Sequence, residues 1–281
     1  MKRIIITLCL VLLICFSFVS CGEDMDLLSG NTDISYKIEN NEAIVTKVPN
    51  KTAVRNIVIP DEYDGVPVTT IKEFAGVNLE YAVKVTIGKN VKEIDDWAFG
   101  NSRNIIEFDV DENNPYICDV DGVLYTKDMK TLLFYPPAGC VQTEKDADGN
   151  EVKFITYTIP EGVETIRSKA FYKCYELREI TFPSTLKSIE EMAFFRCSLD
   201  ELTLPDGMTF IGKDAFSYCT AIEEVTIPAT VTEIGEYAFY SCTNLLSVTM
   251  EGKEADTTLG KKWYPTNNGI DITELNIQWA E

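Results

Sequence analysis

The chain has 281 residues, of which 45 % are hydrophobic and 25 % charged, a composition typical of a folded protein. Its 45 acidic residues outnumber its 25 lysines and arginines, so the formal charge is −20 and a nucleic-acid partner is not expected. Histidine is absent, which excludes Ser-His and Cys-His nucleophilic pairs and every histidine metal site. We expect neither a metal nor another cofactor.

Residues 1–20 have the layout of a secretory signal peptide, because Lys2 and Arg3 precede an almost uninterrupted apolar run that ends at Val19. The run is shorter than the about 20 residues that a membrane-spanning helix needs. It leads into Ser20-Cys21, an end that resembles a bacterial lipoprotein signal, in which a cysteine is acylated and becomes the mature N-terminus. The resemblance implies lipidation of Cys21. The alternative is an ordinary cleaved signal that leaves a free cysteine.

A short segment, residues 21–33, follows the signal peptide and is expected to form a polar tether. Acidic residues stand close behind the cysteine, at Glu23, Asp24 and Asp26. They resemble the surface-export signals of lipoproteins from the Bacteroides group. We therefore expect an exported protein that is lipid-anchored at the outer membrane and exposed at the cell surface. Its contact with the membrane would be made through the lipid anchor alone.

The sequence repeats from residue 158 to residue 250. Each repeat runs Thr-x-Pro, then two inward-facing apolar positions, then Ala-Phe-x-x-Cys, and the pattern recurs every 22 or 23 residues. A fixed period in this range predicts a stacked solenoid, in which each coil contacts only its neighbours. The Phe and Cys positions of four successive repeats are Phe171 and Cys174, Phe194 and Cys197, Phe216 and Cys219, and Phe239 and Cys242.

The repeat around Pro228 shows how each coil is expected to fold. Val225 and Ile227 alternate with polar residues, which predicts a short strand with one buried face. Pro228 cannot donate a hydrogen bond to a sheet, so it ends the strand. We expect residues 238–242 to form a short helical turn on the opposite wall. Because one coil cannot bury its apolar face alone, successive strands should stack in parallel about 4.8 Å apart.

Residues 226–242 combine Thr-Ile-Pro, Ile-Gly and Ala-Phe-x-x-Cys, and this combination resembles the BspA-type leucine-rich repeat family. The resemblance covers residues 34–281. It implies a leucine-rich repeat solenoid of about 22–23-residue coils, built mainly of short parallel β-strands with turns and short helical segments. A β-hairpin cap and a strand-rich insertion are also implied. We place the N-terminal cap at 34–56, the insertion at 105–157, the regular repeats at 158–250 and the C-terminal cap at 251–281.

The four repeat cysteines occupy one column of small buried positions, where a free thiol behaves as a small hydrophobe. We expect reduced thiols there. The alternative is disulfides between adjacent coils, because export permits them and the Cα atoms of stacked coils lie within range. Cys118 and Cys140 lie outside the column, and they either bridge to each other or stay unpaired. The column has no histidine and no Cys-x-x-Cys pair, so a metal site is not expected.

Two columns of outward-facing residues on the predicted strands form the candidate binding face. One interpretation is a docking strip for a basic peptide, a protein or a glycan, because solenoids bind along extended faces. The other is that threonine suits exposed strand positions and that solvated glutamates keep an open sheet soluble. The columns consist of Thr158, Thr181, Thr203 and Thr226 and of Glu179, Glu201 and Glu224.

Adjacent carboxylates such as Glu223 and Glu224 point to opposite faces of a strand and make a poor acid–base pair, so we do not expect an enzyme. The family resemblance implies adhesion to, or interaction with, surface proteins of a host or a neighbouring cell. We therefore expect a cell-surface binding protein with a protein or glycan partner. The alternative is a structural spacer or accessory scaffold subunit without a ligand of its own. A carbohydrate-active enzyme is the least favoured hypothesis.

Overall fold

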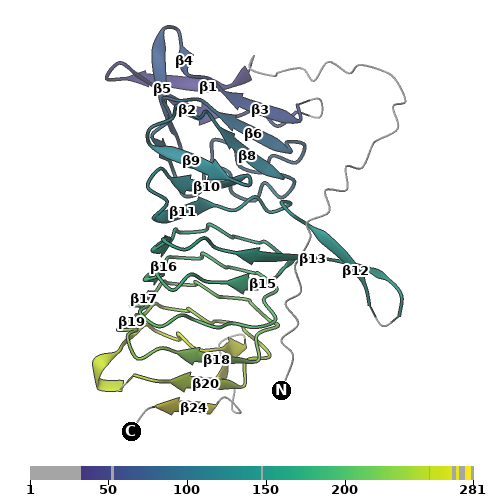
Figure 1. Cartoon of the computed structure of the whole chain (residues 1–281), viewed down its shortest axis with the longest axis vertical. Helices are drawn as coiled ribbons and strands as arrows, with labels where there is room; N and C mark the ends of the chain where they lie inside the picture. The colour runs from purple at the N-terminus through teal and green to yellow at the C-terminus, as the bar shows by residue number, and fades with distance from the viewer. Residues whose placement is uncertain are drawn as a thin grey trace, which may run out of the picture.

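A computed structural model describes residues 33–51, 54–146, 148–252, 254–267, 270–271 and 276–279. They form one elongated stack of β-coils (Figure 1). The predicted signal peptide, the lipidation site Cys21 and nearly all of the tether lie outside the described residues. Within the described part, no helix has both the length and the apolar character that crossing a membrane requires.

An antiparallel hairpin begins the stack, as predicted from the sequence. Strand β1 (Ser35–Glu39) pairs with β2 (Glu42–Lys47) through a turn at Asn40 and Asn41, whose φ angles are 51° and 63°. Asparagine tolerates this left-handed conformation, which two-residue hairpin turns require. Strand β2 then pairs in parallel with β5 (Val66–Ile71), so the hairpin covers the first coil. A two-residue strand, β4 (Glu62–Tyr63), runs antiparallel to β5.

One column of strands forms the surface that we call the strand face (Figure 1). Alternate residues of these strands, such as Val85 and Ile87, are fully buried, as the predicted alternation requires. The column consists of three parallel ladders with breaks between them. The ladders are β3 (Asn56–Ile59), β6 (Lys84–Ile87) and β8 (Glu107–Val110); β13 (Glu151–Thr158) and β15 (Leu177–Thr181); and β18 (Glu224–Ile227), β20 (Ser247–Met250) and β24 (Asn276–Trp279).

A second column of shorter strands closes the coils on the opposite side. Its rungs pair in parallel at a two-residue register that repeats from coil to coil. The coils approach closely here, because a methyl group on Gly235 would lie 2.4 Å from the backbone nitrogen of Lys213. Only glycine fits at that distance. The rungs are β7 (Glu93–Ile94), which pairs with β5 in a separate sheet, and, within one sheet, β11 (Thr131–Phe134), β14 (Thr165–Ile166), β16 (Ser188–Ile189), β17 (Phe210–Ile211), β19 (Glu233–Ile234) and β21 (Thr258–Leu259).

The predicted insertion, residues 105–157, is largely built into the stack. Its first strand, β8, extends the ladder of β6, and β11 pairs in parallel with β14 of the next coil. Strands β9 (Ile117–Val120), β10 (Val123–Thr126) and β11 form an antiparallel meander. The hairpin of β12 (Gln142–Lys145) and β13 projects from the stack (Figure 1).

The meander divides the apolar core into two clusters. Leu124 and Leu133 pack with the N-terminal coils, whereas Val123 and Leu132 pack with the C-terminal coils. Side chains on both faces of β10 and β11 are therefore buried, which explains why Val123–Tyr125 and Leu132–Phe134 are continuously apolar instead of alternating. Asn114, fully buried at the entrance of the meander, is bound to four backbone groups.

Four phenylalanines stack along the C-terminal half of the core, as the repeat predicts. The ring centroids of Phe171 and Phe194 are 4.8 Å apart, those of Phe194 and Phe216 are 5.3 Å apart, and those of Phe216 and Phe239 are 5.2 Å apart. The interplanar angles are 15°, 2° and 10°. Trp263 covers the last ring edge-on at 6.5 Å, so the predicted C-terminal cap closes this column. This regular stacking establishes that the coils are equivalent.

The expected short helical turns at Ala-Phe-x-x-Cys are not found. Lys169 and Lys173, which precede Ala170 and Cys174, have φ angles of 62° and 58°. A right-handed helix cannot continue through left-handed residues, so the chain forms a tight turn there instead. The same two positions are left-handed in the next three coils, at Met192 and Arg196, Asp214 and Tyr218, and Tyr237 and Ser241.

The terminal cap contains the remaining described elements. A 3₁₀ helix, η2 (Glu254–Asp256), precedes β21. Strands β22 (Thr266–Asn267) and β23 (Ile270–Asp271) form a small antiparallel pair. Strand β24 adds one more parallel rung to the strand face beside β20.

All six described cysteines are free, in agreement with the expectation of reduced thiols in the column. Each later thiol donates to the phenylalanine carbonyl oxygen of the preceding coil at 3.1 Å: Cys197 to Phe171, Cys219 to Phe194 and Cys242 to Phe216. Cys118 and Cys140 do not bridge to each other; the Cys118 thiol lies 3.6 Å from the Thr126 carbonyl oxygen and from the Met129 sulfur.

Thiol labelling should separate these cysteines by burial. Burial raises the pKa of Cys219 to about 12 and raises the pKa of Cys174 as well, so their reactive thiolate is scarce at neutral pH. Cys140 is exposed. We expect a maleimide to label Cys140 in the folded protein and to reach the four column cysteines only after denaturation. Mass spectrometry of the labelled peptides checks this, and rapid native labelling of Cys219 would contradict the buried column.

Candidate binding surface

The structure exposes all seven predicted face residues on the C-terminal half of the strand face. Thr158 pairs with Thr181, and Thr203 pairs with Thr226. The pairing is interrupted between these two sets, because β15 and β18 belong to different sheets. The predicted continuous threonine column therefore consists of two shorter ladders.

The interruption coincides with the one repeat that is a residue shorter than its neighbours. Cys197 is followed by the inward Leu199 after one residue, whereas Cys174 and Leu177 are separated by two. Leu202 and Leu204 still point inward, with exposures of 6 % and 7 %, but their segment forms only an isolated bridge at Thr203. We attribute the lost pairing to the shortened turn, which shifts the backbone out of register with the strands on either side.

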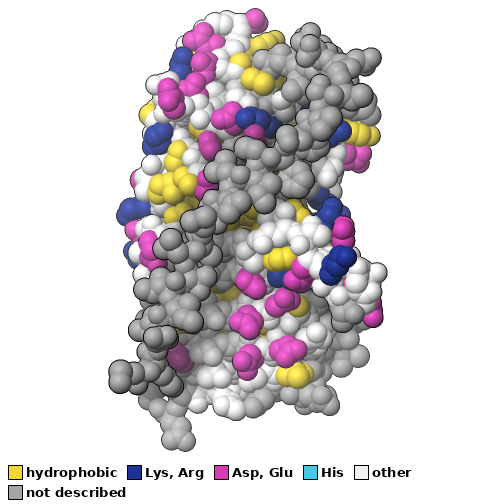
Figure 2. Space-filling view, turned by 45° about the vertical axis from the view of Figure 1, so that its right-hand side comes forward, with side chains coloured by type: hydrophobic (Ala, Val, Ile, Leu, Met, Phe, Trp, Pro, Cys, Tyr) yellow, Lys and Arg dark blue, Asp and Glu magenta, His cyan; other side chains and the backbone are white. Residues whose placement is uncertain are grey.

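Two open grooves flank this unpaired segment. The smaller has a volume of about 340 Å³ and lies between β15 and the segment, with Glu179 and Glu201 on its wall. The larger, of about 540 Å³, lies between the segment and β18 and contains Glu201 and Glu224. Glu201 lines both grooves, so the three predicted glutamates share one continuous surface. Figure 2 shows acidic side chains gathered over the lower half of the molecule, where these coils lie.

The grooves also contain residues that the sequence analysis did not assign to them. Asp200 and Glu223 add two carboxylates to the larger groove. Glu223 and Glu224 line the same groove and are both exposed; Glu223 precedes β18, so the strand alternation from which opposite faces were expected does not extend to it. Apolar surface is provided by Leu246, which is 52 % exposed, and by the half-buried Phe182. We call the five carboxylates of Glu179, Asp200, Glu201, Glu223 and Glu224 the acidic strip.

No lysine or arginine lines either groove. Among the described residues, none of the five carboxylates of the acidic strip forms an ion pair, although carboxylates elsewhere in the stack do, for example Glu164 with Lys130 and Lys187. Unpaired like charges along a hollow surface focus a negative potential and attract cations. The acidic strip therefore has the charge and shape to receive a cationic group.

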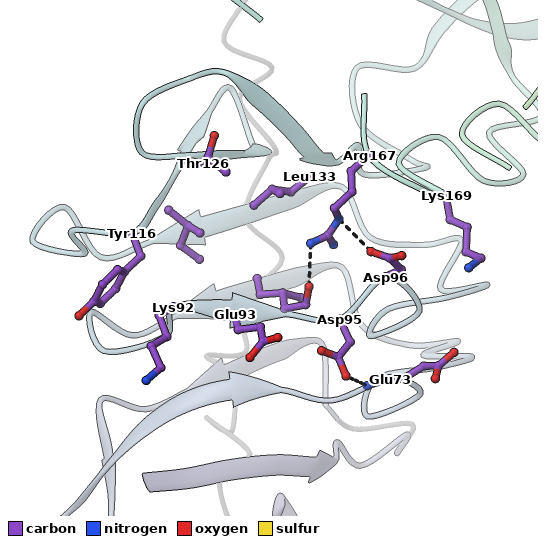
Figure 3. A pocket seen from close by; sticks show the side chains of 12 residues that line it. Glu73, Lys92, Glu93, Asp95, Asp96, Tyr116, Thr126, Leu133, Arg167 and Lys169 are labelled. Carbon is purple, nitrogen blue, oxygen red and sulfur yellow. Dashed lines mark hydrogen bonds and ion pairs between the residues drawn. The ribbon is translucent and has the colours of Figure 1, made fainter. Parts of the chain in front are cut away.

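Another pocket, of about 530 Å³, opens where the two core clusters meet (Figure 3). Arg167 enters it from the position that is occupied by Glu190 in the next coil and by Gly212 and Gly235 in the two coils after it. The Arg167 Nη1 donates to the Ile94 carbonyl oxygen at 2.7 Å, and Nε lies 3.3 Å from Asp96 Oδ1 (Figure 3). The guanidinium also lies 4.7 Å from the centroid of the Phe134 ring, and burial lowers its pKa.

Three other charged side chains of this pocket, those of Asp95, Lys92 and Lys169, also interact within the protein. Asp95 accepts a hydrogen bond from the Glu73 backbone nitrogen at 3.0 Å (Figure 3). Lys92 pairs with Glu42, and Lys169 lies 5.3 Å above the Trp97 ring. We assign this pocket a structural role: Arg167 connects two parts of the stack whose strands do not pair there. No group of His, Cys, Asp and Glu in the described ranges is arranged to hold a metal ion.

Comparisons with known proteins agree with this architecture. The crystal structure of the pneumococcal vaccine antigen PcpA superimposes with a TM-score of 0.58 and 19 % identity, covering 81 % of this chain and 68 % of that one. A leucine-rich repeat protein from Eubacterium ventriosum gives a TM-score of 0.51 and 17 % identity, with 81 % of each chain covered. No curated protein matches the sequence. The BspA type leucine rich repeat region matches six copies over residues 43–120 and 148–265, more than half of the sequence, and the chain therefore belongs to this family.

Proposed function

We propose that this chain is a cell-surface binding protein that docks a cationic segment of a partner on the acidic strip. The observation that carries the proposal is the set of five carboxylates without ion pairs in two adjoining grooves. Leu246 and Phe182 provide apolar surface beside them, so a segment that alternates basic and apolar residues suits the site. A protein ligand can supply the cationic groups through lysine or arginine side chains, and a glycan can supply them if it carries amino groups.

We further propose binding as opposed to catalysis. The chain has no histidine, and the carboxylates of the strip stand in open grooves where water is not excluded. Solenoids present extended surfaces and need no central cleft. The proposal includes export and acylation at Cys21, supported by the apolar leader and by the cysteine at its end. Surface exposure is supported by the description of the structurally similar pneumococcal protein as a vaccine antigen.

Charge reversal of the strip tests the proposal. Purified protein would be screened against extracellular proteins and glycans, and each bound partner retested with a Glu179→Lys, Glu201→Lys, Glu224→Lys variant. Exposed ion pairs contribute about 0.2–1 kcal/mol each, and reversal replaces attraction with repulsion at three sites. We expect the affinity to fall at least about tenfold, with the larger part of the change in the association rate.

A matched variant with Glu62→Lys, Glu112→Lys and Glu233→Lys changes the net charge equally at three exposed positions outside the two grooves. It should keep most of the affinity. Equal losses in both variants would show a non-specific charge effect and contradict the acidic strip. If no protein or glycan binds the wild-type chain, the spacer hypothesis is favoured instead.

A further inference from the structure

A further groove lies at the N-terminal ends of the strand-face ladders, on both sides of the break between β8 and β13. It has a volume of about 560 Å³. Apolar side chains that stay exposed line it: Tyr81 is 36 % exposed, Ile106 50 % and Val141 38 %. Single exposed apolar residues are ordinary, but three in one groove mark a surface that can be covered.

Three cations surround this apolar surface. Arg55, Arg103 and Lys153 line the groove, and none of them has an ion-pair partner in the described part of the chain. Arg103 lies 4.8 Å above the ring of Tyr175. Two carboxylates, Glu80 and Glu176, also line the groove, which leaves an excess of positive charge in a protein whose formal charge is −20. We call this surface the basic groove. A peptide segment that carries both carboxylates and apolar side chains would be complementary to it.

We propose that the basic groove binds the protein's own segment Glu23–Leu28, which lies outside the described residues. The segment reads Glu-Asp-Met-Asp-Leu-Leu. Its three carboxylates match the three cations in number, and Met25, Leu27 and Leu28 match the apolar surface in character. Charge complementarity thus identifies an occupant within the chain itself.

The segment can reach the groove. Asp33 forms an ion pair with Lys51, which fixes the start of the described chain near Arg55. Lys51 and Arg55 are four residues apart, at most about 14 Å along the chain. Leu28 precedes Asp33 by five residues, which extend up to about 18 Å. Covalent connection also raises the effective concentration of the segment to the millimolar range, so even weak contacts suffice for docking.

One consequence rests on the proposed lipid anchor. Only Gly22 separates Cys21 from Glu23. A docked segment would therefore hold the basic groove close to the membrane surface, while the acidic strip, which begins on β15 and extends over the following coils away from the groove, remains accessible to a partner. Docking itself requires no lipid and can be tested without it.

Carbodiimide coupling of the full mature chain in detergent tests the docking. The reagent joins carboxylates to amines in contact, so we expect mass spectrometry to find Lys153 coupled to Glu23, Asp24 or Asp26. An Arg55→Glu, Arg103→Glu variant keeps Lys153 but removes the flanking charges, and we expect its coupling yield to fall at least about fivefold. Lys145, exposed on the same projecting hairpin but outside the groove, is the internal control and should couple much less.

Equal coupling at Lys145 and Lys153, or coupling in the double variant at the wild-type yield, would overturn the proposal. The segment of one chain could also dock in the groove of a second copy. Cross-linking a mixture of isotopically light and heavy protein detects this, because cross-links between a light and a heavy chain would show intermolecular docking and overturn the proposal. An unchanged melting temperature of the variant confirms that it is folded. Because no external partner takes part, a negative result leaves the proposed binding function untouched.

Discussion

Replacement of Phe216 by alanine is expected to lower the free energy of unfolding by about 3–5 kcal/mol. The ring is fully buried and lies between Phe194 and Phe239, nearly parallel to both. Its removal leaves a cavity lined by two neighbouring coils. Those coils are held apart by strand pairing on the second column, so they cannot collapse into the space, and the cost should lie toward the upper part of the range.

Urea denaturation followed by circular dichroism measures this loss. Tyr218→Ala is the matched control, because it removes an aromatic ring from the same coil at a position that is 36 % exposed. We expect the control to cost about 1–2 kcal/mol, less than Phe216→Ala, since the Tyr218 ring loses contacts with Phe195, Tyr240 and Arg196 at the surface but leaves no enclosed cavity. Similar losses for Phe216→Ala and Tyr218→Ala would contradict a core organised around the phenylalanine column.

Asn114→Ala is expected to destabilise the protein by about 3 kcal/mol or more. The side chain is fully buried. Its Nδ2 donates to the carbonyl oxygens of Gly88 and Val91 at 3.0 and 2.8 Å, and its Oδ1 accepts from the backbone nitrogens of Tyr116 and Ile117 at 2.8 and 3.0 Å. Alanine leaves these buried backbone groups without partners, and each unsatisfied group costs about 1–3 kcal/mol.

The neighbouring Asn113 provides the control for this prediction. It is exposed, and its side chain donates to Asp111 within the same turn. Asn113→Ala should therefore change the unfolding free energy by less than about 1 kcal/mol. Differential scanning calorimetry of both variants gives the comparison. A melting temperature for Asn114→Ala equal to that of Asn113→Ala would show that the meander does not depend on this residue.

The repeat carries enough information to predict the stack and its core. Phe and Cys recur at a fixed spacing, and a fixed spacing can be satisfied only if like residues lie on like residues. The exposure of the threonine and glutamate columns follows from strand alternation in the same way. The repeat spacing and the strand alternation can both be read from the sequence without knowledge of the structure.

Other features depend on how coils meet, and the sequence did not reveal them. The left-handed residues at Lys169 and Lys173 are lysines, which carry no turn signal, so a helical turn was expected where the chain turns tightly. The insertion was placed at 105–157 because its strands resemble those of the family's insertion, yet its first strand, β8, pairs in register with β6. The role of Arg167 depends on contacts with Ile94 and Asp96, more than 70 residues away in sequence.

One part of the acidic strip could be predicted from the sequence, and another part depends on how the coils meet. Its glutamate column followed from the alternation, but the two grooves arise because one coil is a residue shorter, and the shortened coil keeps only the isolated bridge between Thr203 and Thr226. The missing residue between Cys197 and Leu199 was visible as a 22-residue spacing among spacings of 23. The loss of strand pairing that it causes could be recognised only once the register of the neighbouring strands was known.

Hydrogen exchange of the strand face, with and without a bound partner, tests the central claim most directly. In the free protein the amides of residues 201–204 should exchange faster than those of β15 and β18, because that segment lacks strand pairing beyond the Thr203 bridge; the Asp200 amide, which donates to the Arg178 carbonyl oxygen at 2.9 Å, should exchange more slowly than they do. A partner that docks on the acidic strip should slow exchange in residues 200–204 and along the groove walls formed by residues 179–182 and 223–224. Protection confined to other faces, with residues 200–204 unchanged, would contradict the account.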